Sequence, residues 1–352
     1  MWAWGRWMPH TDLPSLRPGD LPSPDRIAAA LRGVRNVVRE TPLLESPVLA
    51  QESGAARLFV KAEGLQRTGS FKLRGALWRL MQLDDAARAR GVVAFSSGNF
   101  AQGLAAAGRE LSVPVTIVMP VDAPASKRRA TEALGAEVVL SHHGDAPREV
   151  VAAALARDLA EARGLTLLHP FDDADVVAGQ GTTALEALAQ MAEAGAMPEV
   201  VASPVGGGGL MGGVSLAVRA AHPDVAIWGV EPEGHDGMGR SLRAGARVAA
   251  PGGPTLCDAL QAPMPGVATL AACQAGGVQG VSVGDGPVVR AMARAFEELK
   301  LVLEPSGAVA LAAVLAGVVP VAGKVVLVIA SGGNIAFDRF AECLARAARM
   351  QG

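Results

Sequence analysis

The chain contains 352 residues, 50% of them hydrophobic, and its net charge at pH 7 is only −2. Such a length and apolar content suffice for a large core divided over one or two domains. The balanced charge and the lack of a basic patch argue against a nucleic-acid partner.

Residues 1–24 are expected to form a loosely ordered extension, because they contain several prolines and lack the long apolar stretch of a signal peptide. The longest apolar stretch, residues 308–323, is interrupted by a glycine and a proline. It predicts a buried helix and a turn rather than a membrane span. Cys257, Cys273 and Cys343 are widely spaced, which favours buried thiols in a reducing cytoplasm over disulfides or metal ligands.

The segment TGSFKLRGAL, residues 68–77, places a lysine where a helix begins. Its apolar residues recur at helical spacing, so Ser70 is predicted to N-cap the helix and Lys72 to lie in the first turn. The positive end of the helix, with Arg67 and Arg74 nearby, would favour the neutral amine. A neutral amine attacks carbonyl carbons to form a Schiff base, so Lys72 is the candidate for covalent chemistry. On this segment alone, a solvated helix lysine is the simpler alternative.

Short apolar runs alternate with helical patterns along much of the chain, which predicts βαβ units and a parallel sheet. Two of these runs, residues 92–95 and 325–330, pass directly into polar turns that contain glycine and asparagine. In an open parallel sheet, ligands bind at the carboxyl ends of the strands. Asn99 and Ser331, in the two turns, are therefore expected at a ligand-binding edge.

A third predicted strand leads into the glycine run Gly206–Gly209 and then into an apolar helix. Residues without side chains at a helix N-terminus let backbone N–H groups converge on a phosphate. Gly207, Gly209 and Gly212 also match the dinucleotide-binding fingerprint, with Glu231 as the acid that would bind a ribose. A nicotinamide enzyme is thus one alternative for this segment, and a flexible glycine turn is another.

A hydride-transfer site explains the glycine run but gives Lys72 no task. Pyridoxal phosphate needs both features, an amine for its aldehyde and a cradle for its phosphate. We therefore expect Lys72, Asn99, the glycine run and Ser331 to face one cleft.

Five segments occur in an order that resembles the serine/threonine dehydratase and serine racemase family of fold-type II pyridoxal phosphate enzymes. They are GSFKLRGA (69–76), SSGNFAQG (96–103), HPFDD (169–173), AGQGT (178–182) and PVGGGG (204–209). The likeness runs from about Ile27 to Ala347 and includes the segments VEP and EPSGA, which begin at Val230 and Glu304.

The resemblance implies an α/β fold like that of the tryptophan synthase β subunit. Two open, twisted, mostly parallel sheets flanked by helices would hold pyridoxal 5'-phosphate in the cleft between two domains. Residues 25–89 and 169–350 would form a discontinuous large domain, and residues 90–168 a small one. Assembly into a homodimer or homotetramer is expected. The chain ends soon after Ala347, so we expect no regulatory domain and no control by isoleucine.

The resemblance also assigns roles to individual residues. Lys72 would hold the cofactor as an internal aldimine, Asn99 would contact the ring hydroxyl, and Ser331 the pyridine nitrogen. Further cofactor contacts would come from Gly206, Gly207, Gly208, Gly209, Leu210 and Glu304. The loop of Ser96, Ser97, Gly98 and Asn99 would bind the substrate carboxylate, and Ser97 is a second catalytic candidate.

These roles suit β-elimination. A serine hydroxyl does not keep a proton on the pyridine nitrogen, which makes the cofactor a weaker electron sink. Lys72 would remove the α-proton of a β-hydroxy L-amino acid such as threonine or serine, and the product would hydrolyse to a 2-oxo acid and ammonia. An amino-acid racemase is the main alternative, because Ser97 lies where serine racemases carry a second acid–base group. A nicotinamide-dependent or non-catalytic ligand-binding protein is the third.

Three departures from the family bear on substrate and metal. Phe100 replaces a histidine after Ser-Gly-Asn, and Ala259 replaces a glycine after Asp258; either change would reshape the pocket. Hydroxyaspartate and aromatic β-hydroxy amino acids therefore stay open as substrates. Gly237 replaces an acidic metal ligand six positions after Glu231, so we expect no tightly bound magnesium or calcium.

Overall fold

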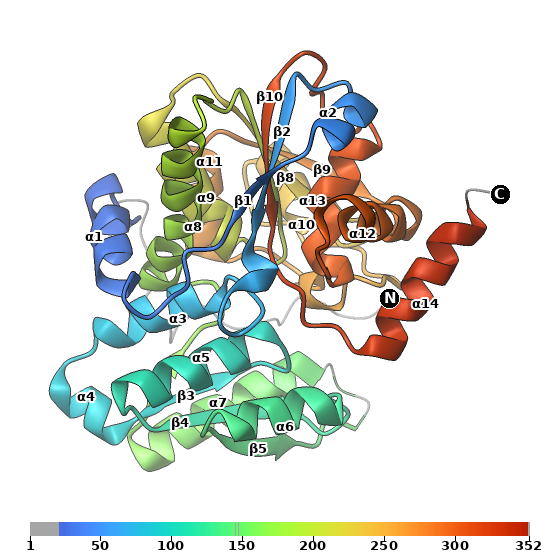
Figure 1. Cartoon of the computed structure of the whole chain (residues 1–352). Helices are drawn as coiled ribbons and strands as arrows, with labels where there is room; N and C mark the ends of the chain where they lie inside the picture. Colours follow the sequence, from blue (N-terminus) through green and yellow to red (C-terminus); the bar gives the residue numbers. More distant parts are fainter. Residues whose placement is uncertain (1–20, 145, 147, 351–352) are drawn as a thin grey trace.

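The computed structural model describes residues 21–144, 146 and 148–350. Most of the predicted extension, residues 1–24, lies outside the described residues. The chain forms two sheets with helices on their faces (Figure 1). Among the described residues, no helix is both long and apolar enough to cross a membrane.

The larger sheet has six strands in the order β1-β2-β10-β7-β8-β9. Their bounds are Leu43–Glu45 (β1), Arg57–Ala62 (β2), Val200–Pro204 (β7), Ala226–Pro232 (β8), Val278–Val283 (β9) and Val325–Ala330 (β10). Only the edge pair β1 and β2 is antiparallel within these strands. In the central strand β10, Val326 and Val328 enter one core cluster, whereas Leu327 and Ile329 enter another. Burial of both faces explains why this strand is apolar throughout.

The smaller sheet has four parallel strands in the order β5-β4-β3-β6. Their bounds are Val92–Phe95 (β3), Val115–Pro120 (β4), Glu137–Ser141 (β5) and Thr166–Leu168 (β6). The helices beside it are Asn99–Leu111 (α5), Ala125–Ala133 (α6) and Arg148–Arg163 (α7). These strands fall within residues 90–168, but the division into two domains at those positions stays a prediction.

Helices cover both faces of the larger sheet (Figure 1). On one side are Pro47–Ser53 (α2), Asp285–Leu299 (α12) and Pro305–Leu315 (α13), and on the other Ala174–Glu193 (α8), Gly209–Ala221 (α9) and Val267–Ala275 (α11). The remaining elements are Pro24–Val34 (α1), Glu63–Leu65 (η3), Asp85–Arg90 (α4), Gly237–Ala244 (α10), Asp258–Leu260 (η4) and Phe337–Arg349 (α14). All residues of α13 up to Val314 are buried, which confirms the buried helix predicted from the apolar stretch.

Helix α3 (Lys72–Met81) lies between the two sheets and packs against both α5 and α8 (Figure 1). Its apolar face includes Leu73, Leu77 and Leu80, all buried. The helix therefore presents its first residue, Lys72, at the junction of the two sheets.

Candidate active site

A cavity of about 480 Å³ opens where strands of both sheets end. Phe95 ends β3 and Pro204 ends β7, and both line it. Lys72, Asn99, Ser331 and the whole run Gly206–Gly209 also line it, and so do Ser96, Ser97, Gly98, Leu210 and Glu304. The expectation that the lysine, the two polar turns and the glycine run face one cleft is confirmed.

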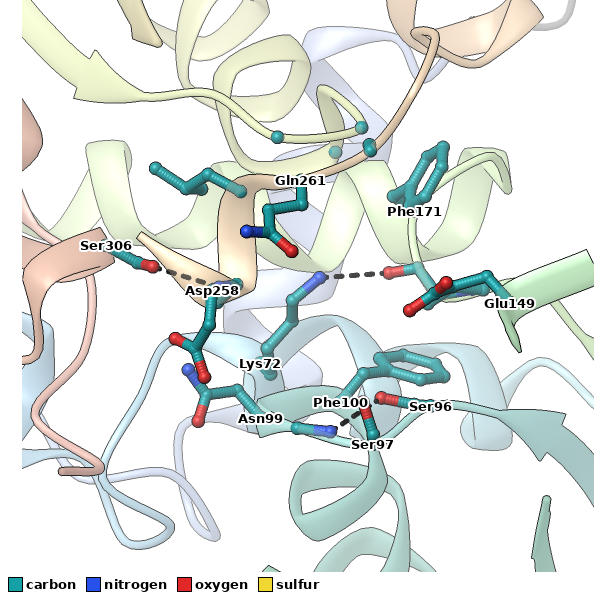
Figure 2. A pocket seen from close by; sticks show the side chains of 18 of the residues that line it. Lys72, Ser96, Ser97, Asn99, Phe100, Glu149, Phe171, Asp258, Gln261 and Ser306 are labelled. Atoms are coloured by element: carbon teal, nitrogen blue, oxygen red, sulfur yellow. Dashed lines mark hydrogen bonds between the residues drawn. The ribbon is translucent and has the colours of Figure 1, made fainter. Parts of the chain in front are cut away.

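Lys72 is the first residue of α3 and points into the cavity (Figure 2). Its amine donates a hydrogen bond to the carbonyl oxygen of Pro170 at 3.1 Å. The same nitrogen lies 5.1 Å from the ring centroid of Phe71 and 5.6 Å from that of Phe100. Burial lowers the pKa of Lys72 to about 8. A substantial fraction of the amine is therefore neutral near physiological pH.

Two details of the sequence prediction were wrong. Phe71, not Ser70, occupies the N-cap position of α3, and the Ser70 hydroxyl has no hydrogen-bond partner in the described part of the chain. The lowered pKa of Lys72 arises from burial and not from neighbouring cations. Arg67 is paired with an exposed glutamate, and Arg74 is turned toward buried carboxylates.

Asn99 belongs to a chain of side-chain hydrogen bonds at the edge of the cavity. Its Nδ2 donates to Oε1 of Glu304 at 2.6 Å, and its Oδ1 accepts from Nδ2 of Asn334 at 2.8 Å. Burial raises the pKa of Glu304 to about 7. Because an amide nitrogen carries two hydrogens, Asn99 keeps one N–H for a ligand.

The loop Ser96–Asn99 leads from β3 into the N-terminus of α5, whose first N–H groups have no acceptor within the helix. Gly98 N donates to the Ser96 hydroxyl at 3.3 Å (Figure 2). Among the described residues, the hydroxyls of Ser97 and Ser331 form no hydrogen bond to the protein. The loop and both hydroxyls are thus available to a ligand in the cavity.

The two central residues of the glycine run are packed too closely to carry side chains. A Cβ on Gly207 would lie 2.4 Å from the ring of Phe171, and one on Gly208 would lie 2.5 Å from Met238. Gly208 also has a φ of 97°, which favours glycine. Helix α9 begins at the next residue, Gly209, so the N–H groups of the run have no helical acceptor and are free to donate to an anion.

Phe100 and Ala259, the two departures near the substrate pocket, both line the cavity. Phe100 is only 2% exposed and also belongs to the core around α5, so it has a packing role as well. Ala259 N donates to the hydroxyl of Ser306 at 3.0 Å, which ties η4 to α13.

Glu231 is not in the cavity, so its proposed role as a ribose ligand is wrong. It lies near the end of β8, and its carboxylate accepts hydrogen bonds from Met238 N and Gly239 N at 2.7 and 2.8 Å. Burial raises its pKa to about 8. Glu231 thus stabilises the first turn of α10 through these hydrogen bonds. The expected absence of a tightly bound metal beside it stays a prediction.

Several cavity residues were not predicted from the sequence. The Pro170 carbonyl that holds Lys72 lies 98 positions away in the chain. Lys127, Arg148 and Glu149 stand on helices of the smaller sheet and also line the cavity. Charged residues on helices are usually solvated, so the sequence contained no signal that these three face inward.

A buried ion cluster holds α3 in place behind Lys72. Arg74 donates to Glu63 at 2.8 Å and to Glu186 at 2.7 Å, and Lys61 donates to Glu186 at 2.6 Å. Arg74, Lys61 and Glu63 are fully buried. The cluster joins β2, η3, α3 and α8, and it fixes the helix whose first residue is the lysine.

Sequence comparisons place this geometry in a family. The family described as pyridoxal-phosphate dependent enzyme matches residues 34–332. The L-threonine ammonia-lyase of Thermotoga maritima is 42% identical over 309 residues, which cover 88% of this chain and 75% of that protein. The L-threo-3-hydroxyaspartate ammonia-lyase of a Pseudomonas species is 41% identical over 321 residues, covering 91% of this chain and 97% of that one.

Comparison with solved structures supports the same family. Maize serine racemase superposes with a TM-score of 0.84 at 31% identity, over 94% of this chain and 98% of that one. The serine racemase of Dictyostelium discoideum superposes with a TM-score of 0.82 at 32% identity, over 90% of this chain and 99% of that one. The predicted family and fold-type II architecture are thereby confirmed, and the nicotinamide alternative is excluded. The chain belongs to the pyridoxal-phosphate dependent enzymes.

Proposed function

We propose that the enzyme is an ammonia-lyase that converts a β-hydroxy L-amino acid, such as threonine or serine, to a 2-oxo acid and ammonia. The observation that carries the proposal is the cavity itself, which Lys72 lines together with the loop Ser96–Asn99 and the glycine run Gly206–Gly209. Relatives named as threonine and hydroxyaspartate ammonia-lyases support it. A cytoplasmic location and assembly into a homodimer or homotetramer stay predictions from the sequence.

The cavity fits pyridoxal phosphate. The nest of Gly206–Gly209 suits its phosphate, and the free N–H of Asn99 suits its ring hydroxyl. Ser331 offers a neutral hydroxyl for the ring nitrogen, while Leu210 and Glu304 complete the walls. Lys72 supplies the amine that binds the aldehyde. When bound, the cofactor supplies an electron sink for negative charge at the substrate Cα.

The residues of this chain perform the proton transfers and the positioning. Backbone N–H groups of the Ser96–Asn99 loop hold the substrate carboxylate at the N-terminus of α5. Once the substrate amine has replaced it at the aldehyde, the freed Lys72 amine takes the α-proton, and its pKa of about 8 lets it accept and then return a proton near neutral pH. The β-hydroxyl leaves as water with the proton that the Lys72 ammonium returns. The remaining enamine tautomerises to an imine, whose hydrolysis releases ammonia and the 2-oxo acid.

Replacing Gly207 with alanine is expected to weaken cofactor binding, because the added Cβ would lie 2.4 Å from the Phe171 ring. We expect the Kd for pyridoxal phosphate to rise at least about tenfold, measured by titrating the apoenzyme. Gly237→Ala is the matched control, since its Cβ would meet nothing closer than 3.5 Å. An unchanged Kd in Gly207→Ala would show that the nest does not hold the phosphate.

A serine-type racemase is the second candidate, and Ser97 is the observation that favours it. This serine lines the cavity, and serine racemases are among the relatives. No neighbouring base in the described residues bonds to its hydroxyl, so we assign it to carboxylate binding. We expect Ser97→Ala to keep 2-oxo acid formation within about tenfold of the wild type and to remove any residual racemisation. Loss of a predominant L-to-D conversion in this variant would contradict the lyase assignment.

A further inference from the structure

Six charged side chains line the cavity in addition to Lys72. They are Lys127, Arg148, Asp122, Glu149, Asp258 and Glu304. Once Lys72 holds the cofactor, two cations face four acidic groups among the described lining residues. Acidic groups therefore outnumber basic groups in the cavity lining, and this lining disfavours a ligand with an extra carboxylate.

Both cations are already paired. The Lys127 ammonium lies 2.6 Å from the carboxylate of Asp258, and the Arg148 guanidinium lies 3.3 Å from Asp122 and 2.8 Å from Glu149. Lys127 stands on α6, beside the smaller sheet, and Asp258 begins η4, beside the larger one. Their ion pair thus joins α6 to η4 at the cavity lining. Asp258 and Glu149 lie on opposite sides of Lys72 (Figure 2).

The charges of this pair reach the cofactor end of the cavity. Burial raises the pKa of Glu304, the partner of Asn99, to about 7; Asp258 adds to the rise, and Lys127 opposes it. The Ser96–Asn99 loop lines the same cavity as both members of the pair, so a substrate bound at this loop shares the cavity with both charges.

We propose that the Lys127–Asp258 ion pair determines which side-chain charge the enzyme accepts in its substrate. Because Asp258 pairs with the Lys127 ammonium, this ammonium cannot bind a second substrate carboxylate. The enzyme therefore favours amino acids with uncharged side chains. The inference rests on the proposed deamination and narrows its substrates. Although hydroxyaspartate ammonia-lyases are among the relatives, threonine and serine are the expected substrates here.

The test compares two substrates in two opposed variants of the holoenzyme. The readout is the kcat/KM for L-threo-3-hydroxyaspartate divided by that for L-threonine, because general damage to the enzyme cancels in this ratio. Asp258→Asn should raise the ratio about tenfold, and Lys127→Met should lower it by a similar factor. Asp224→Asn, which removes an exposed carboxylate outside the cavity, is the control and should leave the ratio within about twofold.

A binding measurement gives a second readout without turnover. L-Aspartate and L-alanine carry no β-hydroxyl and so cannot undergo the elimination of water. Their affinities can therefore be measured from the change that their binding causes in cofactor absorbance. Asp258→Asn should favour L-aspartate over L-alanine by about tenfold relative to the wild type.

Three outcomes overturn the inference. The first is a wild type that prefers hydroxyaspartate to threonine. The second is a ratio that stays constant while both variants lose activity toward both substrates. That result is expected if the ion pair only holds α6 and η4 together. The third is an unchanged relative affinity for L-aspartate. If the wild type deaminates no β-hydroxy amino acid, the proposed function fails instead, and the binding comparison still tests the ion pair.

Discussion

Lys72→Ala is expected to lower kcat for 2-oxo acid release by more than about 1,000-fold. The variant lacks the amine to which we assign cofactor binding and removal of the α-proton, and no other lysine or arginine lining the described cavity is unpaired. It should also lose the visible absorption band that the bound cofactor gives the wild type. Both effects are measured on purified protein reconstituted with pyridoxal phosphate.

Lys324→Ala is the matched control for this variant. Lys324 is half-exposed and pairs with Glu199 at 3.0 Å on the protein surface, so its loss should change neither colour nor activity. Activity of Lys72→Ala within about tenfold of the wild type would show that another group removes the α-proton.

The second large effect is expected on stability. Arg74→Ala removes the cation that bridges Glu63 and Glu186 inside the protein and leaves both carboxylates short of partners. We expect the free energy of unfolding to fall by about 3–5 kcal/mol, measured by urea denaturation of the apoenzyme. Lys72 should also become more mobile, because Arg74 lies in the same first turn of α3.

The control for Arg74 is an exposed ion pair. Arg339 and Glu342 lie 3.2 Å apart on α14, and their side chains are 49% and 68% exposed. Arg339→Ala should therefore lower the free energy of unfolding by less than about 1 kcal/mol. Equal losses in the two variants would mean that the buried cluster adds no specific stability.

Most of the fold followed from local sequence patterns. Buried parallel strands such as β10 read as continuous apolar runs, and the turns after them hold the polar residues that line the cavity. The glycine run and the lysine segment were recognisable because both need special local chemistry, a side-chain-free nest and an amine at a helix start.

The rest depended on contacts between distant segments. The hydrogen bond from Asn99 to Glu304 joins residues that are 205 positions apart. The low pKa of Lys72 comes from burial beside Phe71, Phe100 and Pro170, which no local pattern reveals. For the same reason, the sequence does not distinguish Lys127 from any other surface residue of a helix. Its position in the cavity depends on the contact between α6 and η4.

The most direct test of the lyase assignment is a product analysis of the holoenzyme with L-serine. Pyruvate and ammonia are quantified enzymatically, and D-serine by chiral chromatography, in the same reaction. The lyase assignment predicts pyruvate and ammonia in equal amounts, in large excess over D-serine. D-Serine as the main product, or no turnover of any β-hydroxy amino acid by the cofactor-loaded protein, would contradict it.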